Sequence, residues 1–141
     1  MNVGYIDSSF LLSLIFEDNN YDKTIEIWNK LDITLGSVLL EIECMINVYK
    51  YCMLHIDDKK LYREKKTELK ELLSSINRKT VDEEIVLEIQ NHDKLKRLKS
   101  LDSIHLATAN IFNKLINEKL LICSYDKNMI MIAGEMGMTI I

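Results

Sequence analysis

The sequence contains no proline and only four glycines, so the residues that usually mark turns are almost absent. Segment boundaries are therefore inferred from polar clusters and from changes of hydrophobic period. Cysteine is scarce too: the three cysteines are an odd number and form no C-x-x-C pair, which argues against a disulfide framework and a zinc knuckle. We expect free, buried thiols in a reducing cytoplasm.

Long apolar runs and an excess of basic charge are also missing. No run approaches the roughly 18 apolar residues of a membrane span. The N-terminus lacks a basic segment and places Asp7 where a signal peptide would be apolar. The formal net charge of −4 excludes a coat protein that binds nucleic acid through a basic surface. The sequence thus predicts a soluble, cytoplasmic protein without a membrane partner.

The composition is that of one globular domain spanning residues 1–141, because 48% of the residues are hydrophobic and 28% are charged. Short apolar segments alternate with helical ones. Strands are expected at 2–6, 33–35, 78–82, 119–125 and 138–141. Helices are expected at 8–16, 21–31, 37–53, 57–76, 83–91, 101–109 and 127–135, the first capped by Ser8 and Ser9. Continuously apolar strands favour a small parallel sheet covered on both faces, a three-layer α/β/α sandwich.

For two of these helices the sequence also predicts which face is buried and which is exposed. In segment 37–53 the expected buried face holds Val38, Ile42, Met45, Tyr49 and Cys52. Segment 57–76 is an outer helix whose lysines alternate with glutamates, so pairing on a solvent face explains its charge. Its thin leucine stripe packs either on the domain or against a partner chain.

Acids stand where apolar strands end. Asp7 follows the first strand and Asp126 follows segment 119–125, and a third acid, Asp102, opens a helix of small residues. Each alone is explained as a helix cap or first-turn acid. If the two strands are adjacent and parallel, however, their carboxylates emerge at one edge of the sheet, where such folds bind ligands. Oxygen donors without histidine or cysteine suit Mg²⁺ or Mn²⁺.

Four segments in combination resemble the PIN-domain family, specifically the VapC toxins of bacterial toxin–antitoxin pairs. They are Val3–Ser9, Gly36–Glu43, Leu101–Ala109 and Tyr125–Met129. The resemblance implies a single PIN-like nuclease domain, an endoribonuclease that depends on Mg²⁺ or Mn²⁺. Its acidic quartet, both catalytic and metal-binding, falls on Asp7, Glu43, Asp102 and Asp126. The implied partners are an RNA substrate, a second copy forming a homodimer, and a VapB-like antitoxin whose C-terminal segment occupies the cleft.

The second acid of this quartet has two candidates. Glu41 and Glu43 lie on one predicted helix about 200° apart, and each falls about 100° from Ile42, so periodicity does not choose between them. The six-residue step from Ser37 resembles the family pattern and selects Glu43. Many family members also carry an arginine in the next turn, where this chain has Ile46, Asn47 and Lys50, so no substrate contact is carried over from that arginine.

Other polar residues near these motifs have competing roles. Ser9 either orients Asp7 or a phosphate, or caps the first helix. His105 shares a helix face with Asp102, and its apolar surroundings favour a buried histidine over a metal ligand. Basic residues just before Asp102 are candidates for phosphate contacts, with Arg97 and Lys99 nearest to it. The full basic group is Lys94, Lys96, Arg97 and Lys99.

Three other functions are alternatives to the nuclease. A haloacid dehalogenase would place a second aspartate two residues after Asp7, where Ser9 stands. A receiver domain would end its last strand near a lysine, whereas this chain ends in Ile140 and Ile141. A catalytically inactive PIN-like scaffold that binds protein or RNA stays as the alternative.

Overall fold

The computed structural model describes all residues, 1–141, and contains one five-stranded sheet. Its strands are β1 (Val3–Ile6), β2 (Ile33–Ser37), β3 (Ile76–Lys79), β4 (Leu120–Cys123) and β5 (Thr139–Ile140). They lie in the order β3-β2-β1-β4-β5, and every neighbouring pair is parallel. The predicted parallel α/β/α architecture is therefore confirmed.

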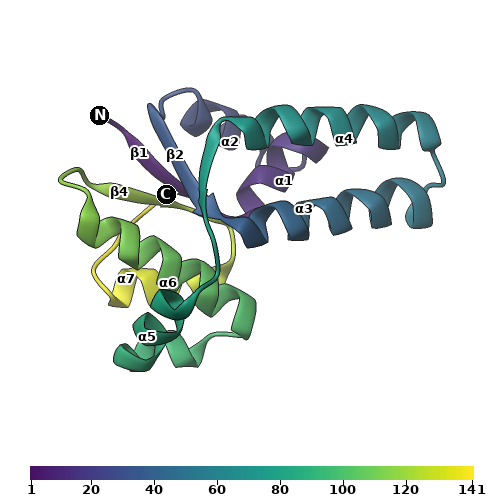
Figure 1. Cartoon of the computed structure of the whole chain (residues 1–141). Helices are drawn as coiled ribbons and strands as arrows, with labels where there is room; N and C mark the ends of the chain where they lie inside the picture. Colours follow the sequence, from purple (N-terminus) through teal and green to yellow (C-terminus); the bar gives the residue numbers. More distant parts are fainter.

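Helices cover both faces of the sheet (Figure 1). On one side lie α1 (Ser8–Phe16), α2 (Tyr21–Trp28), α3 (Val38–Tyr49) and α4 (Lys59–Ser74), with a π-helical turn, η1 (Lys50–His55), after α3. On the other lie α5 (Glu83–Asn91), a 3₁₀ turn η2 (Asp93–Arg97), α6 (Ser100–Leu115) and α7 (Lys127–Glu135). None of these helices combines the length and the apolar character that crossing a bilayer requires.

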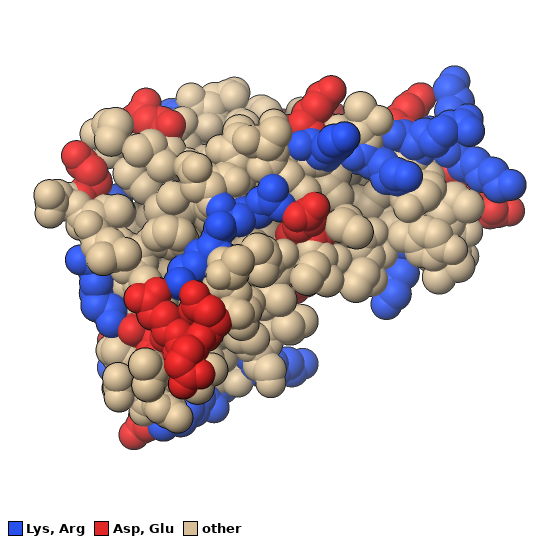
Figure 2. Space-filling model, viewed as in Figure 1, with Lys and Arg blue, Asp and Glu red and all other residues tan.

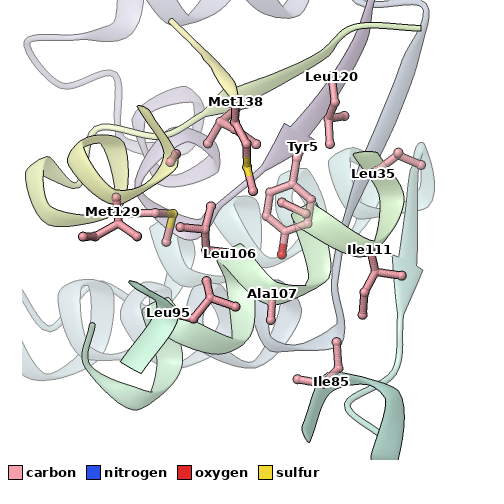
Figure 3. Close-up of a cluster of buried hydrophobic side chains, with 14 of the residues drawn as sticks. Tyr5, Leu35, Ile85, Leu95, Leu106, Ala107, Ile111, Leu120, Met129 and Met138 are labelled. Carbon is pink, nitrogen blue, oxygen red and sulfur yellow. The ribbon is translucent and has the colours of Figure 1, made fainter. Parts of the chain in front are cut away.

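Two hydrophobic cores lie on opposite faces of the sheet. Val3 and Tyr5 of β1 enter the core beneath α5, α6 and α7 (Figure 3), whereas Ile6 enters the core beneath α1, α3 and α4. Because successive side chains of a strand point to opposite faces, a strand buried on both sides is apolar throughout. The three cysteines are free and buried, as expected, and burial raises the pKa of Cys123 to about 12.

Helix α3 differs from the prediction in the face that it buries. Its buried residues step by four, from Leu40 through Cys44 to Val48, and Cys52 continues the line in η1. Ile42, Met45 and Tyr49, expected in the core, are each about half exposed. The helix is apolar on most of its circumference, so its hydrophobic pattern is compatible with two different buried faces. The prediction from the sequence named the wrong one.

Several boundaries also differ, for local reasons. The first helix is capped by Asp7, not by Ser8 or Ser9 as predicted, because the Asp7 carboxylate accepts the Phe10 amide. Strand β3 lies earlier than expected because Asp82 leaves the sheet to cap α5. The predicted bounds of α5 and α7 are confirmed, and α7 is followed by Gly137 at φ 79°.

Candidate active site

The candidate site begins where β1 and β4 end side by side. Ile6 pairs with Cys123 in the parallel register, and the Asp7 amide donates to the Cys123 carbonyl at 3.2 Å. The chain builds β2 and β3 on one side of β1 and then crosses to build β4 and β5 on the other. Strand order therefore reverses between β1 and β4, the place where open parallel sheets bind ligands.

Asp7 is buried, with 3% of its surface exposed, and both of its carboxylate oxygens are engaged. Oδ1 accepts from the Ser9 hydroxyl at 2.7 Å and from the Phe10 amide at 3.0 Å, and Oδ2 accepts from the Ser124 hydroxyl at 2.5 Å. Burial raises the pKa of Asp7, and these hydrogen bonds oppose the rise. The side chain is thus fixed in one orientation.

Two serine hydroxyls join the loop after β1 to the loop after β4. Ser9 donates to Asp7 and accepts from the Tyr125 amide at 2.9 Å. Ser124 donates to Asp7 and accepts from the Asp126 amide at 3.0 Å. Ser9 therefore orients Asp7 and does not cap the helix. Ser124 was not singled out from the sequence, although its place between an apolar strand and an acid was a usable signal.

Asp126, just before α7, and Asp102, at the start of α6, approach the same edge. Asp126 caps α7, its Oδ1 accepting from the Met129 amide at 2.8 Å. Asp102 lies in the first turn of α6. Its pKa is raised by partial burial and then by the negative charges of Asp126 and Glu43, against the opposing effects of His105 and Lys99. Asp102 is thus within electrostatic reach of both other carboxylates.

The two glutamates of α3 point to different neighbours. Glu43 Oε1 lies 2.5 Å from His105 Nε2, and its Oε2 accepts a long bond of 3.4 Å from the Ser8 hydroxyl. Glu41 instead forms an ion pair with Arg78 at the end of β3. The structure therefore brings Glu43, and not Glu41, toward the edge that holds the three aspartates.

His105 is almost fully buried, with 1% of its surface exposed. Its Nδ1 lies 2.9 Å from the hydroxyl oxygen of Tyr5, and its Nε2 contacts Glu43. Figure 3 shows the Tyr5 side chain extending from β1 with its hydroxyl toward α6. The expectation of a buried histidine holds, with a contact to an acidic residue that the sequence did not indicate.

Among models of known protein families, that of the PIN domain matches residues 4–135 of this chain. The chain belongs to the PIN domain family. No curated protein matches the sequence. PIN domains are generally nucleases that use divalent metal ions.

Two solved structures resemble this PIN domain. One, a toxin–antitoxin complex from Klebsiella pneumoniae, has a TM-score of 0.55 and 19% identity over 86% of this chain and 84% of that chain. The other, PAE2754 from Pyrobaculum aerophilum, has a TM-score of 0.53 and 20% identity over 94% of this chain and 86% of that chain. At these identities the likeness concerns the fold.

The basic residues expected to contact phosphate are mostly engaged elsewhere in this PIN domain. Arg97 pairs with Glu135 at 2.9 Å, Lys96 pairs with Asp93, and Lys94 donates to the Glu135 carbonyl. Lys99 forms no ion pair within the chain, and its charge lowers the pKa of Asp102. Of this group, Lys99 is the one whose charge reaches the edge of the sheet near Asp7, Glu43, Asp102 and Asp126, which we call the acidic edge.

On the face drawn in Figure 2, basic side chains again lie beside acidic ones. Acidic side chains gather near α5, and a row of basic ones lies beside them. Lys79 pairs with Asp82 and Glu84, and Lys114 pairs with Glu88. The basic residues near α5 are therefore paired with acids, and further basic side chains on this face lie over α4, so attraction of a polyanion depends on local charges.

The four acids share an edge without forming a ready-made metal centre. No three of the His, Cys, Asp and Glu side chains lie close enough together to hold an ion. Asp7 is turned to its serines, Glu43 to His105, and Asp126 to the amide of Met129. The donors are nevertheless all oxygens, and the mutual charge that raises the pKa of Asp102 is what a divalent cation would relieve. The donor set fits Mg²⁺ or Mn²⁺, and binding requires these side chains to close on the ion.

Proposed function

We propose that this PIN domain is a metal-dependent endoribonuclease that acts as the toxin of a VapBC-type toxin–antitoxin pair. The observation that supports it is the gathering of Asp7, Glu43, Asp102 and Asp126 at the reversal of strand order, where Asp102 is subject to the charge of two neighbouring acids. Membership of a family of nucleases supports the same activity.

The proposed roles follow from the contacts. Asp7, Asp102 and Asp126 hold Mg²⁺ or Mn²⁺, and Glu43 completes the site. When bound, the ion polarises the phosphodiester and lowers the pKa of a bound water for in-line attack. Ser9 contributes to substrate binding indirectly, by fixing the carboxylate of Asp7.

Substrate contacts in this proposal come from few residues. Lys99 supplies positive charge for a phosphate beside Asp102. Arg97 joins it only by releasing Glu135, to which it is paired on an exposed surface, where such pairs are weak. Binding therefore relies on the metal and on Lys99 more than on a basic surface.

A groove between α3 and α4 is the surface we assign to the antitoxin. Its volume is about 810 Å³, and apolar side chains such as Ile46, Tyr49 and Leu54 line it, together with Lys66 and Lys70. Such a groove suits an apolar helix face flanked by acids. One structural neighbour is itself a toxin–antitoxin complex. The proposed setting is the cytoplasm, where the buried thiols stay reduced.

Cleavage of RNA by the purified protein tests the activity. We expect cleavage with Mg²⁺ or Mn²⁺, none after chelation with EDTA, and none with Asp102→Asn. Glu41→Gln is the matched control, because it removes a carboxylate from α3 that is paired with Arg78 and lies off the site. Cleavage that survives both EDTA and Asp102→Asn would refute the proposed mechanism.

A second candidate is an inactive PIN-like scaffold that binds RNA or protein. It is favoured by the absence of three side chains already close enough to hold an ion. The same experiment separates the two functions. RNA retained by the wild-type protein but never cut, at any concentration of Mg²⁺ or Mn²⁺, would establish the scaffold.

A further inference from the structure

His105 connects the hydrophobic core to the acidic edge through both of its ring nitrogens. The ring sits on α6, with Tyr5 of β1 at Nδ1 and Glu43 of α3 at Nε2. Tyr5 and His105 are both almost completely buried, whereas 22% of the Glu43 side chain is exposed. A continuous chain of contacts therefore runs from the core to a carboxylate that reaches solvent.

Both ring nitrogens of His105 are held by neighbouring side chains. Nδ1 lies 2.9 Å from the hydroxyl oxygen of Tyr5, and Nε2 lies 2.5 Å from Oε1 of Glu43. Because the ring is almost fully buried, these contacts fix its orientation, and the ring in turn restrains the carboxylate of Glu43.

We infer that His105, backed by Tyr5, is a positioning residue that holds the Glu43 carboxylate at the acidic edge, from which it closes on a divalent cation. This inference deepens the proposed function and rests on it. The Ser8 hydroxyl, at 3.4 Å, restrains Glu43 weakly in comparison. Without His105, Glu43 is free to turn into solvent, since its side chain is already partly exposed.

Calorimetric titration with Mn²⁺ measures the effect on the site itself. Removing a supporting contact of this kind weakens metal binding by about 10- to 100-fold, and we expect that loss for His105→Leu. His105→Gln restores an N–H near the position of Nε2 and should recover most of the affinity. Tyr5→Phe keeps the volume and removes the backing hydroxyl, so it should lose roughly tenfold, the lower end of that range.

Two matched controls separate positioning from general loss of stability. His92→Gln makes the same substitution at a histidine that contacts Glu88, away from the acidic edge. Ile111→Val removes a methylene from the core of the same helix, α6. Both should bind Mn²⁺ with wild-type affinity, even where Ile111→Val lowers the melting temperature. If His105→Leu does not fold, Tyr5→Phe and His105→Gln carry the comparison.

The outcomes distinguish this inference from the proposed function. If the wild type binds Mn²⁺ and cleaves RNA, but the His105 and Tyr5 variants bind Mn²⁺ equally well, the positioning role is wrong and the nuclease stands. If the wild type binds no Mn²⁺, both are wrong. If affinity falls in the controls as much as in the His105 variants, the effect is one of stability and the inference fails.

Discussion

At the scale of single residues, Asp7 combines a structural and a proposed chemical role. Its Oδ1 caps α1, and its Oδ2 is held by Ser124. Asparagine is as good a cap as aspartate, and it carries no charge to bury. The cap and the charge of Asp7 are therefore separable by one substitution.

We expect Asp7→Asn to abolish RNA cleavage while leaving the metal-free protein as stable as the wild type or more stable, because burial penalises the charged carboxylate. Thermal unfolding without metal measures the stability. A variant that unfolds would show that Asp7 is a structural residue and would contradict its assignment to the metal site.

The pH dependence of stability gives a second test of Asp7. Its pKa is raised in the folded state from an ordinary value of 3.8, so the folded protein holds this proton more tightly than the unfolded chain does. The contribution of Asp7 to stability is therefore lost as the pH rises from about 4 through the folded-state pKa. We expect the stability advantage of Asp7→Asn over the wild type to grow from acidic pH to neutrality in urea unfolding, and an advantage that does not change with pH would contradict this.

At the scale of helices and strands, the sequence predicted the structure where a local pattern of residues determines it. Strands β1 and β4 were predictable because their apolar runs are uninterrupted and each is followed by an acid within three residues. The buried face of α3 was not, because two apolar stripes compete and only packing against α1 and α4 selects the one that includes Leu40 and Cys44.

The cap of α7 supplies a prediction for an element. Asp126 accepts from the Met129 amide, so Asp126→Ala should cost about 0.5–2 kcal/mol of unfolding free energy. Asp126→Asn keeps the cap and should cost less, yet both variants should lose RNA cleavage. Urea unfolding and a cleavage assay on both proteins check this, and full activity in Asp126→Asn would remove Asp126 from the site.

At the scale of the whole molecule, the position of the site depends on the order of the strands in the sheet, and that order was not predictable from local sequence patterns. Nothing local in β4 indicates that it lies beside β1, because that pairing forms between segments over a hundred residues apart. The same holds for the contact of His105 with Glu43. Periodicity did not choose between Glu41 and Glu43, whereas the resemblance to the family selected Glu43, and the structure pairs Glu41 with Arg78. The four segments that resemble the family indicated which residues to examine, and the fold indicates how they meet.

The exposed face of α3 leads to a prediction about assembly. Ile42, Met45 and Ile46 are each about half exposed on neighbouring turns, and apolar patches of this kind mark interaction surfaces. We expect the wild type to sediment as a homodimer and the Ile42→Glu variant, at a position outside the groove assigned to the antitoxin, to sediment as a monomer. The variant should still fold, because residue 42 lies outside the core. A wild type that stays monomeric at high concentration would contradict the predicted dimer.

The central claim is that acids distant in the chain form one site for a divalent cation at the edge between β1 and β4. Anomalous diffraction from crystals soaked in Mn²⁺ tests it most directly. The account predicts an anomalous peak within coordination distance of the carboxylates of Asp7, Asp102 and Asp126, with Glu43 beside it. A well-occupied Mn²⁺ peak elsewhere, or no peak at this edge at saturating Mn²⁺, would contradict it.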